Sequence, residues 1–341
     1  MAEKTLFTVS ASPHAKGNAS TRGVMLDVLI ALVPAGFAGV AVFGLRALAV
    51  MAVSVGTALL SEFLIVKLLK KPFTLGDLSA AVTGLLLAYN LPVTAPLWMA
   101  AIGAVVAIVV VKHFFGGLGQ NFANPAITAR IVLLVSFAKF MTNFPDPTAP
   151  DAVASATPLN VLGKLDLTSD VAFQISRRVS EGALPGAVRM LFGSRGGCIG
   201  EVCGVALLLG AVYLLVRRVI SLTIPGFFIG TVAVMSLIFS HGSLTYTFYA
   251  LTSGGLLLGA FFMATDYVTS PINFVGKIVF GIGCGLLTSV IRRFGSLPEG
   301  VSYAILLMNI LTPLIERITR PTYFGKLKVK KEKKAKGGDA A

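Results

Sequence analysis

A threonine hydroxyl that follows a run of small side chains is the first feature with chemical potential. From Asp151 the chain reads Asp-Ala-Val-Ala-Ser-Ala-Thr-Pro-Leu, and between Asp151 and Thr157 only Val153 is larger than serine. An enzyme that modifies a hydroxyl must draw the acceptor segment into its own active site, and bulky neighbours would obstruct it. The pattern makes Thr157 a candidate acceptor of a covalent group. The alternative is a Ser/Ala-rich loop with an incidental Thr-Pro pair.

Two carboxamides form the next candidate site. Asn121 and Asn124 stand three positions apart in Asn-Phe-Ala-Asn-Pro, before a long apolar run. If both lie on the first helical turn, they share one face, because positions i and i+3 are neighbours on a helix. Paired amides can donate and accept hydrogen bonds at the edge of a planar ligand. The alternative is a plain helix start, with Asn as the N-cap and Pro125 in the first turn.

Two acidic residues are candidates for handling an ion. Asp266 ends an apolar run beside Thr265, Thr269 and Ser270, and Glu62 lies inside another run. An ionisable group at membrane depth is costly and therefore suggests a function. The alternatives are snorkelling to an interface or pairing with a nearby Lys or Arg.

The composition is that of an integral membrane protein. Of 341 residues 55% are hydrophobic and 13% charged, and the mean hydropathy is +0.84. The net charge of +14 does not indicate nucleic-acid binding, because nine of the 29 Lys and Arg lie between Arg317 and Lys336. Such a tail favours the cytoplasmic side and contact with anionic lipid. Three Cys and three His predict neither a disulfide framework nor a metal site.

The chain contains ten apolar runs that could each cross a bilayer, whose core takes about 20 helical residues. They are 24–44, 47–68, 76–92, 95–112, 123–142, 199–216, 222–240, 247–265, 274–291 and 300–316. Ten crossings put both termini on the cytoplasmic side and the loop with Thr157 outside. The predicted organisation is a tail and first five-helix unit over 1–142, an extracytoplasmic loop over 143–198, a second five-helix unit over 199–316, and a basic tail over 317–341.

The two units look like an internal repeat. Thr-Gly-Leu-Leu-Leu-Ala at 83–88 echoes Ser-Gly-Gly-Leu-Leu-Leu-Gly at 253–259, and Lys-His-Phe-Phe-Gly at 112–116 echoes Ile-Arg-Arg-Phe-Gly at 291–295. Units of five crossings must be inverted relative to each other, because five is odd. Helix breakers stand at corresponding places, around Asn90-Leu-Pro92 and Thr265-Asp266. Interrupted helices at membrane depth are tolerated where they line a cavity or bind something.

Four motifs together resemble one family of membrane proteins, shared by the Rnf complex (its RnfD component) and the sodium-translocating NADH:quinone oxidoreductase (its NqrB component). They are Ser12-Pro-His14 before Val24-Met-Leu-Asp-Val28; Gly116-Gly-Leu-Gly-Gln-Asn-Phe-Ala-Asn-Pro-Ala126; the segment from Asp151 to Leu159; and Gly200-Glu-Val202. The short N-terminal segment is similar to the Rnf version, whereas Phe122-Ala123 and Thr128-Ala-Arg130 depart from it. The choice of complex stays open.

The resemblance implies an all-α membrane protein of two inverted five-helix repeats, similar to ammonium and urea transporters. It implies FMN esterified through its phosphate to Thr157 by a flavin transferase, and a non-covalent riboflavin near Asn121 and Asn124. Electrons would pass through these flavins, coupled to Na⁺ or H⁺ movement. The implied partners are the other subunits of an Rnf-type ferredoxin:NAD oxidoreductase, among them a second flavinylated subunit and iron–sulfur subunits.

Two other functions remain open. The chain could be the corresponding quinone-reductase component, which differs only in its complex. It could instead be a small-solute channel on the same scaffold, although a channel has no need of the Thr157 motif. The chain has no Gly-rich strand–turn–helix for a nicotinamide dinucleotide, so ferredoxin and NADH would bind other subunits.

Overall fold

Each apolar run of the sequence overlaps at least one helix of the structure. In the computed structural model, the described residues are 20–70, 74–144, 157–165, 170–193, 196–295 and 299–321. The segment Asp151–Ala156, the Ser12-Pro-His14 motif and the tail beyond 321 lie outside them. Among the described residues the structure is all-α, with one isolated β-bridge between Pro92 and Cys198.

The first group of helices precedes the Thr157 segment. It comprises α1 (Thr21–Phe43), α2 (Leu45–Leu68), η1 (Leu75–Asp77), α3 (Ser79–Tyr89), α4 (Leu97–Val105), its π-helical continuation η2 (Val106–His113), α5 (Pro125–Ser136) and α6 (Ala138–Met141). Within this group α2 packs on α3 and α4, and α5 packs on η2.

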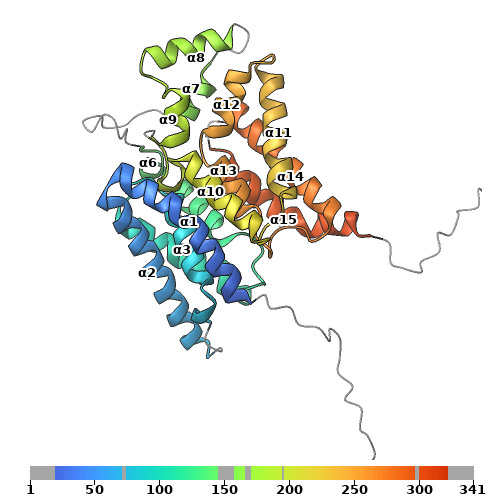
Figure 1. Ribbon diagram of the computed structural model, residues 1–341. Coiled ribbons are helices and arrows are strands. Elements are labelled where there is room, and N and C mark those ends of the chain that lie inside the picture. Colours follow the sequence, from blue (N-terminus) through green and yellow to red (C-terminus); the bar gives the residue numbers. More distant parts are fainter. Residues whose placement is uncertain are drawn as a thin grey trace, which may run out of the picture.

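The second group follows that segment. It comprises η3 (Ile199–Glu201), α10 (Gly204–Val216), α11 (Thr223–Phe239), α12 (Leu244–Thr252), α13 (Leu256–Leu258), η4 (Gly259–Met263), α14 (Phe274–Phe294) and α15 (Val301–Thr319). Here α14 packs on α11 and α15. The two groups meet where α1 packs on α10 and α5 packs on α15, and Figure 1 shows them side by side, from blue to teal and from yellow to red.

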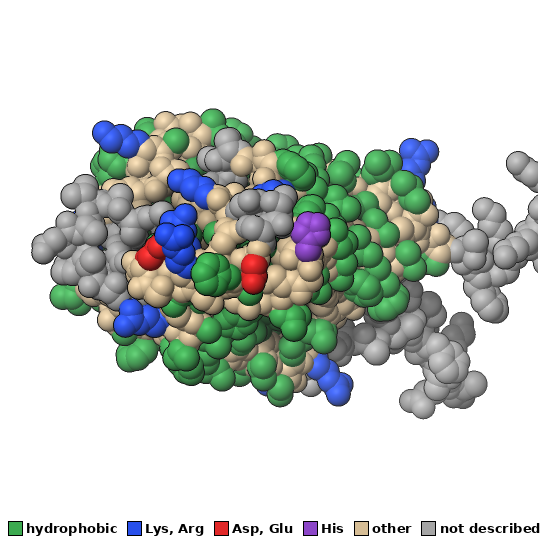
Figure 2. Space-filling view, turned by 90° about the horizontal axis from the view of Figure 1, so that it is seen from above, with side chains coloured by type: hydrophobic (Ala, Val, Ile, Leu, Met, Phe, Trp, Pro, Cys, Tyr) green, Lys and Arg blue, Asp and Glu red, His purple; other side chains and the backbone are tan. Residues whose placement is uncertain are grey.

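Apolar side chains on the outside of these helices identify their environment. Phe37 of α1 is 76% exposed and Val135 of α5 is 72% exposed. Helices that are apolar all round are expected inside a large core or in lipid, and a soluble monomer rarely exposes so much apolar surface. Seen end-on in Figure 2, hydrophobic side chains surround a centre with more polar atoms and scattered Lys and Arg. The chain is therefore a multi-pass membrane protein.

Helix length is a stricter test of the expected crossings. In the part of the chain that the structure describes, four helices, α1, α2, α14 and α15, are each long and apolar enough to cross a membrane. The pair formed by α12 and by α13 with η4, bent by 64°, makes a fifth if it counts as one span. Five further apolar helices are shorter. Ten crossings and an inverted repeat remain predictions.

The segment expected as a polar loop contains helices of its own. These are α7 (Pro158–Gly163), α8 (Val171–Ser180) and α9 (Ala187–Phe192), and Figure 1 shows them gathered at one end of the helical body, next to α12. A small apolar core joins them to Tyr249 of α12 through Leu162, Ile175 and Met190. Val171 and Ile175 are four residues apart on α8 and both are buried in this core, as on the apolar face of an amphipathic helix. The polar composition of the segment as a whole hides this spacing in the sequence.

Close packing of α3 on α2 yields a first testable prediction. A Cβ at Gly84 would lie 2.9 Å from the Val55 Cα and 3.0 Å from the Ser54 carbonyl oxygen. Gly84→Ala should therefore lower the stability by about 1–3 kcal/mol, seen as a lower thermal unfolding midpoint in detergent. Gly56→Ala on α2, where nothing lies within 4 Å of the new Cβ, is the control and should be neutral or stabilising. Equal midpoints for the two variants would contradict this packing.

Candidate functional site

A cavity of about 250 Å³ opens between the start of α1, α3, the start of α5 and the segment after η4. Most of its wall is apolar, including Met25, Val28, Val82, Leu86, Phe261 and Phe262. Polar side chains are fewer and lie among them: Thr21, Ser79, Thr83, Lys112, Asn121, Asn124, Thr265, Asp266 and Tyr267. An apolar cavity with a few convergent polar groups is the usual form of a small-molecule site.

Both predicted asparagines line this cavity, although not in the predicted way. Asn124 is the N-cap of α5, and its Oδ1 accepts hydrogen bonds from the Ala126 and Ile127 amides at 3.0 and 3.3 Å. Asn121 precedes the helix, and its Nδ2 donates to the Ala123 carbonyl at 2.9 Å. The premise of one shared helical turn is therefore wrong, because Pro125 opens the helix one residue after Asn124. The capping alternative is confirmed for Asn124, whose Nδ2 also reaches the Met263 carbonyl at 3.3 Å.

Asp266 lines the same cavity, three residues after η4 ends at Met263. Its carboxylate accepts from the Val268 amide at 3.4 Å and from the Thr269 hydroxyl at 3.2 Å. The contact of Asn124 with Met263 brings the start of α5 to the end of η4. Three of the predicted site residues, Asn121, Asn124 and Asp266, thus meet at one cavity.

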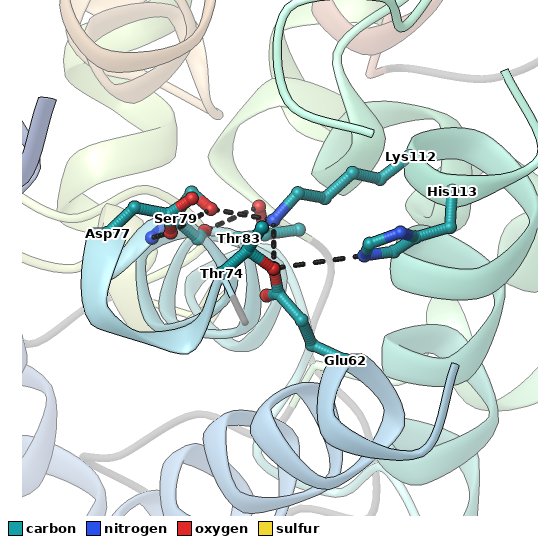
Figure 3. Close-up of polar contacts among 7 residues, drawn as sticks. All are labelled: Glu62, Thr74, Asp77, Ser79, Thr83, Lys112 and His113. Atoms are coloured by element: carbon teal, nitrogen blue, oxygen red, sulfur yellow. Dashed lines mark hydrogen bonds and ion pairs between the residues drawn. The ribbon is translucent and has the colours of Figure 1, made fainter. Parts of the chain in front are cut away.

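Glu62 does not line that cavity but belongs to a buried polar cluster (Figure 3), which shares Lys112 and Ser79 with the cavity wall. Its side chain is 0% exposed, and its Oε1 accepts from the Lys112 ammonium at 2.9 Å and from the Thr74 hydroxyl at 2.9 Å. His113 Nε2 lies 3.7 Å from the same oxygen. The alternative of pairing with a nearby lysine is therefore confirmed for Glu62. Lys112, which the sequence analysis placed in the internal repeat but not in any site, connects Glu62 to the cavity.

Thr157 lies away from the cavity and is only 5% exposed. It is the N-cap of α7, where its Oγ1 accepts from the Asn160 amide at 3.3 Å. A pocket of about 10 Å³ beside it is lined by Gly197, Glu201, Gly254 and Glu299. That volume holds about one water molecule. A flavin does not fit in the space that the described residues leave beside Thr157, although the hydroxyl itself is of the required kind.

A second charged cluster, also not predicted from the sequence, borders the Thr157 pocket. Arg130 of α5 donates to the Ser302 hydroxyl at 2.6 Å, forms an ion pair with Glu299, and lies 3.6 Å from the Cys198 sulfur. Ligand atoms of Cys198, Glu201 and Glu299 lie within 4.8 Å of one another, as metal ligands could. Because Arg130 already supplies a positive charge to this group, a metal ion would be in competition with it. The signal that could have identified this cluster in the sequence is a charged residue, Arg130, inside the apolar run 123–142.

Comparison with known proteins gives a family match over nearly the whole chain. Residues 8–325 match the family described as "NQR2, RnfD, RnfE family". The matched range includes both the cavity residues and Thr157.

Individual relatives align over most of their own length as well. The chain is 46% identical to the D subunit of the Na(+)-translocating ferredoxin:NAD(+) oxidoreductase complex of Acetobacterium woodii, over 96% of this chain and 98% of the relative. It is 43% identical to the D subunit of the proton-translocating ferredoxin:NAD(+) oxidoreductase complex of Clostridium ljungdahlii, over 95% and 97%. The D subunit of the ion-translocating oxidoreductase complex of Halorhodospira halophila is 38% identical, over 94% and 96%.

Proposed function

Because the chain belongs to the NQR2, RnfD, RnfE family, we propose that it is the RnfD component of an ion-translocating ferredoxin:NAD oxidoreductase complex. The observation that carries this proposal is full-length similarity to relatives that are named as that component. The chain acts as part of an enzyme, and its partners are the other subunits, among them a second flavinylated subunit and iron–sulfur subunits. It lies in the cell membrane with both termini in the cytoplasm.

Riboflavin is the ligand that we propose for the cavity. The apolar walls suit a tricyclic ring, while the amides of Asn121 and Asn124 offer donors and acceptors at its edge. Bound there, riboflavin would supply electron transfer by accepting and releasing electrons. The protein's own contribution is to hold the ring, exclude water and provide polar groups around it.

Replacing the asparagine amides should weaken riboflavin binding. Asn124→Ser keeps an N-cap oxygen for α5 but removes the amide, and Asn121→Leu removes the other. Each lost hydrogen bond should cost on the order of 1 kcal/mol, so the double variant should bind riboflavin about 30-fold more weakly. Equilibrium dialysis of the full chain with riboflavin measures this. Asn273→Ser is the control, since Asn273 is the N-cap of α14 and lies outside the cavity. Unchanged affinity in the double variant would leave helix capping as the only role of Asn124.

FMN joined to the Thr157 hydroxyl through a phosphoester is the second proposed cofactor. The family membership and the Asp151–Leu159 motif support it. Since Thr157 is buried and the pocket beside it is small, the flavin transferase must act before α7 packs on α12, or α7 must move away. The flavin ring would then lie outside the 10 Å³ pocket.

Asp266 and Glu62 are the residues that we propose for the ion path. Carboxylate and hydroxyl oxygens suit a hard cation, and a carboxylate can equally carry a proton. The relatives named for Na⁺ and for protons are 46% and 43% identical to this chain, so similarity alone does not favour either ion.

Purification of the intact complex tests the proposed function. Mass spectrometry should find this chain together with the other subunits, carrying one FMN less one water, and acid extraction should release riboflavin. A purified chain without partners or flavin would instead favour a solute channel. Partners of the NADH:quinone oxidoreductase type would favour the corresponding NqrB component of that complex.

A further inference from the structure

Lys112 belongs both to the cavity wall and to the buried cluster around Glu62. It is 3% exposed, and its ammonium donates to the Glu62 carboxylate at 2.9 Å and to the Ser79 hydroxyl at 2.6 Å. Figure 3 shows the lysine side chain extending from η2 toward these two acceptors. Lys112 and Ser79 both line the cavity, so this positive charge lies at the boundary between the ligand space and the acid.

The ammonium still has donor capacity. A lysine ammonium carries three N–H bonds, and two are directed at Glu62 and Ser79. Among the described residues no third acceptor lies within hydrogen-bond distance of it. A ligand in the cavity could therefore accept the remaining N–H without breaking either existing bond.

Stability alone does not account for this ion pair. Buried pairs recover little more than the cost of removing both charges from water, and apolar residues of similar volume often replace them without loss. Ser79 is in turn held by Asp77, whose Oδ1 accepts from the Ser79 hydroxyl at 2.6 Å and from its amide at 2.8 Å. The acceptors of Lys112 are thus themselves fixed, and the ammonium is held at one point of the wall.

A charge that develops inside the cavity would interact strongly with this ammonium. In surroundings of low dielectric constant, opposite charges attract far more than in water. An isoalloxazine ring that takes up two electrons and one proton carries one negative charge. The electrons come from the complex in the cell, or from dithionite in the experiment below, and the proton comes from solvent.

We propose that Lys112 compensates the negative charge of the reduced flavin in this cavity, and that Glu62 is the counter-ion of Lys112 when the flavin is oxidised. This inference rests on the proposed riboflavin site. It assigns to Lys112 a direct influence on how readily that flavin is reduced. It also links the flavin to Glu62, because the reduced ring and the Glu62 carboxylate would then share the single positive charge of Lys112.

The test measures the midpoint potential of riboflavin bound to the full chain, made without a flavin transferase so that no covalent FMN contributes. Lys112→Met should reduce the preference for reduced over oxidised flavin at least tenfold, which equals about 30 mV for a two-electron couple. Glu62→Gln should shift the potential in the opposite direction, because it leaves the lysine charge uncompensated. Lys112→Arg should stay close to the wild type. Lys67→Met is the control, since Lys67 of α2 lies outside the cavity and its ammonium is 5.9 Å from the Phe63 ring.

Each outcome decides between the two proposals. Bound riboflavin with an unchanged potential in Lys112→Met, or a shift of the same sign in Glu62→Gln, overturns the role of Lys112 and leaves the riboflavin site intact. If Lys112→Met does not fold, Glu62→Gln and Lys112→Arg still carry the test. A wild-type chain that binds no riboflavin overturns the proposed site and this inference together.

Discussion

A chain carrying Thr157→Asn will show no flavin fluorescence in a denaturing gel, whereas the wild type made with a flavin transferase will fluoresce. Asparagine is as good an N-cap as threonine. Its Oδ1 can accept from the Asn160 amide in place of the Thr157 hydroxyl, so α7 stays capped. Asparagine has no hydroxyl, so it cannot form a phosphoester. The expected loss is complete, and intact mass should fall by one FMN less one water.

Two further variants separate the chemistry from the fold at this position. Thr157→Ser retains both the cap and a hydroxyl and should keep part of the modification. Thr157→Ala removes both, and should also destabilise α7 by roughly 1 kcal/mol. Fluorescence that survives in the Asn variant would mean that the flavin is attached to another residue or is not covalently held.

The sequence predicted the location of the helices and some of their ends, but it did not predict the interruption inside the run 247–265. The run 247–265 was expected as one span, yet α12 ends at Thr252 and the chain bends by 64° before α13. The carbonyls of Ala250 and Ser253 at this break accept from Arg292 at 2.8 and 3.2 Å. An interrupted helix at membrane depth needs such partners, and this one comes from a residue about 40 positions further along the chain.

The sequence predicted individual residues of the candidate site better than it predicted how they are arranged. Asp266 could be selected because an acid is costly in apolar surroundings, and Asn121 and Asn124 because they stand three positions apart before an apolar run. Their common cavity depends on contacts such as Asn124 with the Met263 carbonyl, 139 residues apart, which no local pattern contains. Lys112 could not be predicted for the same reason: a lysine at the end of an apolar run suggests snorkelling, and only the fold brings it to Glu62.

Asp266→Asn is expected to uncouple ion movement from electron transfer. Asparagine has nearly the same size, and its Oδ1 can still accept from the Val268 amide, so riboflavin and FMN should remain bound. Loss of a charged ligand weakens a cation's binding by roughly 10–100-fold. The number of ions moved per electron, measured with the complex in sealed vesicles at an ion concentration that does not saturate the variant, should therefore fall, while Asp266→Glu should retain part of it. Asp170→Asn on the exposed N-cap of α8 removes an equal charge elsewhere and should change nothing.

The pH dependence of the wild type offers an independent check on Asp266. Burial raises the pKa of its carboxyl above the usual range for aspartic acid, so protonation begins at a higher pH than for an exposed aspartate. A protonated Asp266 resembles the Asn variant, because both lack the negative charge. With Na⁺ as the transported ion, wild-type transport should therefore decline as the pH is lowered through this raised pKa, and the Asn variant should show no such decline. If the proton is the ion, transport should not depend on Na⁺, and the Asn variant should still fail to acidify the vesicles. Unchanged ions per electron in Asp266→Asn would remove Asp266 from the ion path and make Glu62, with its oxygen bound to Lys112, the first residue to substitute next.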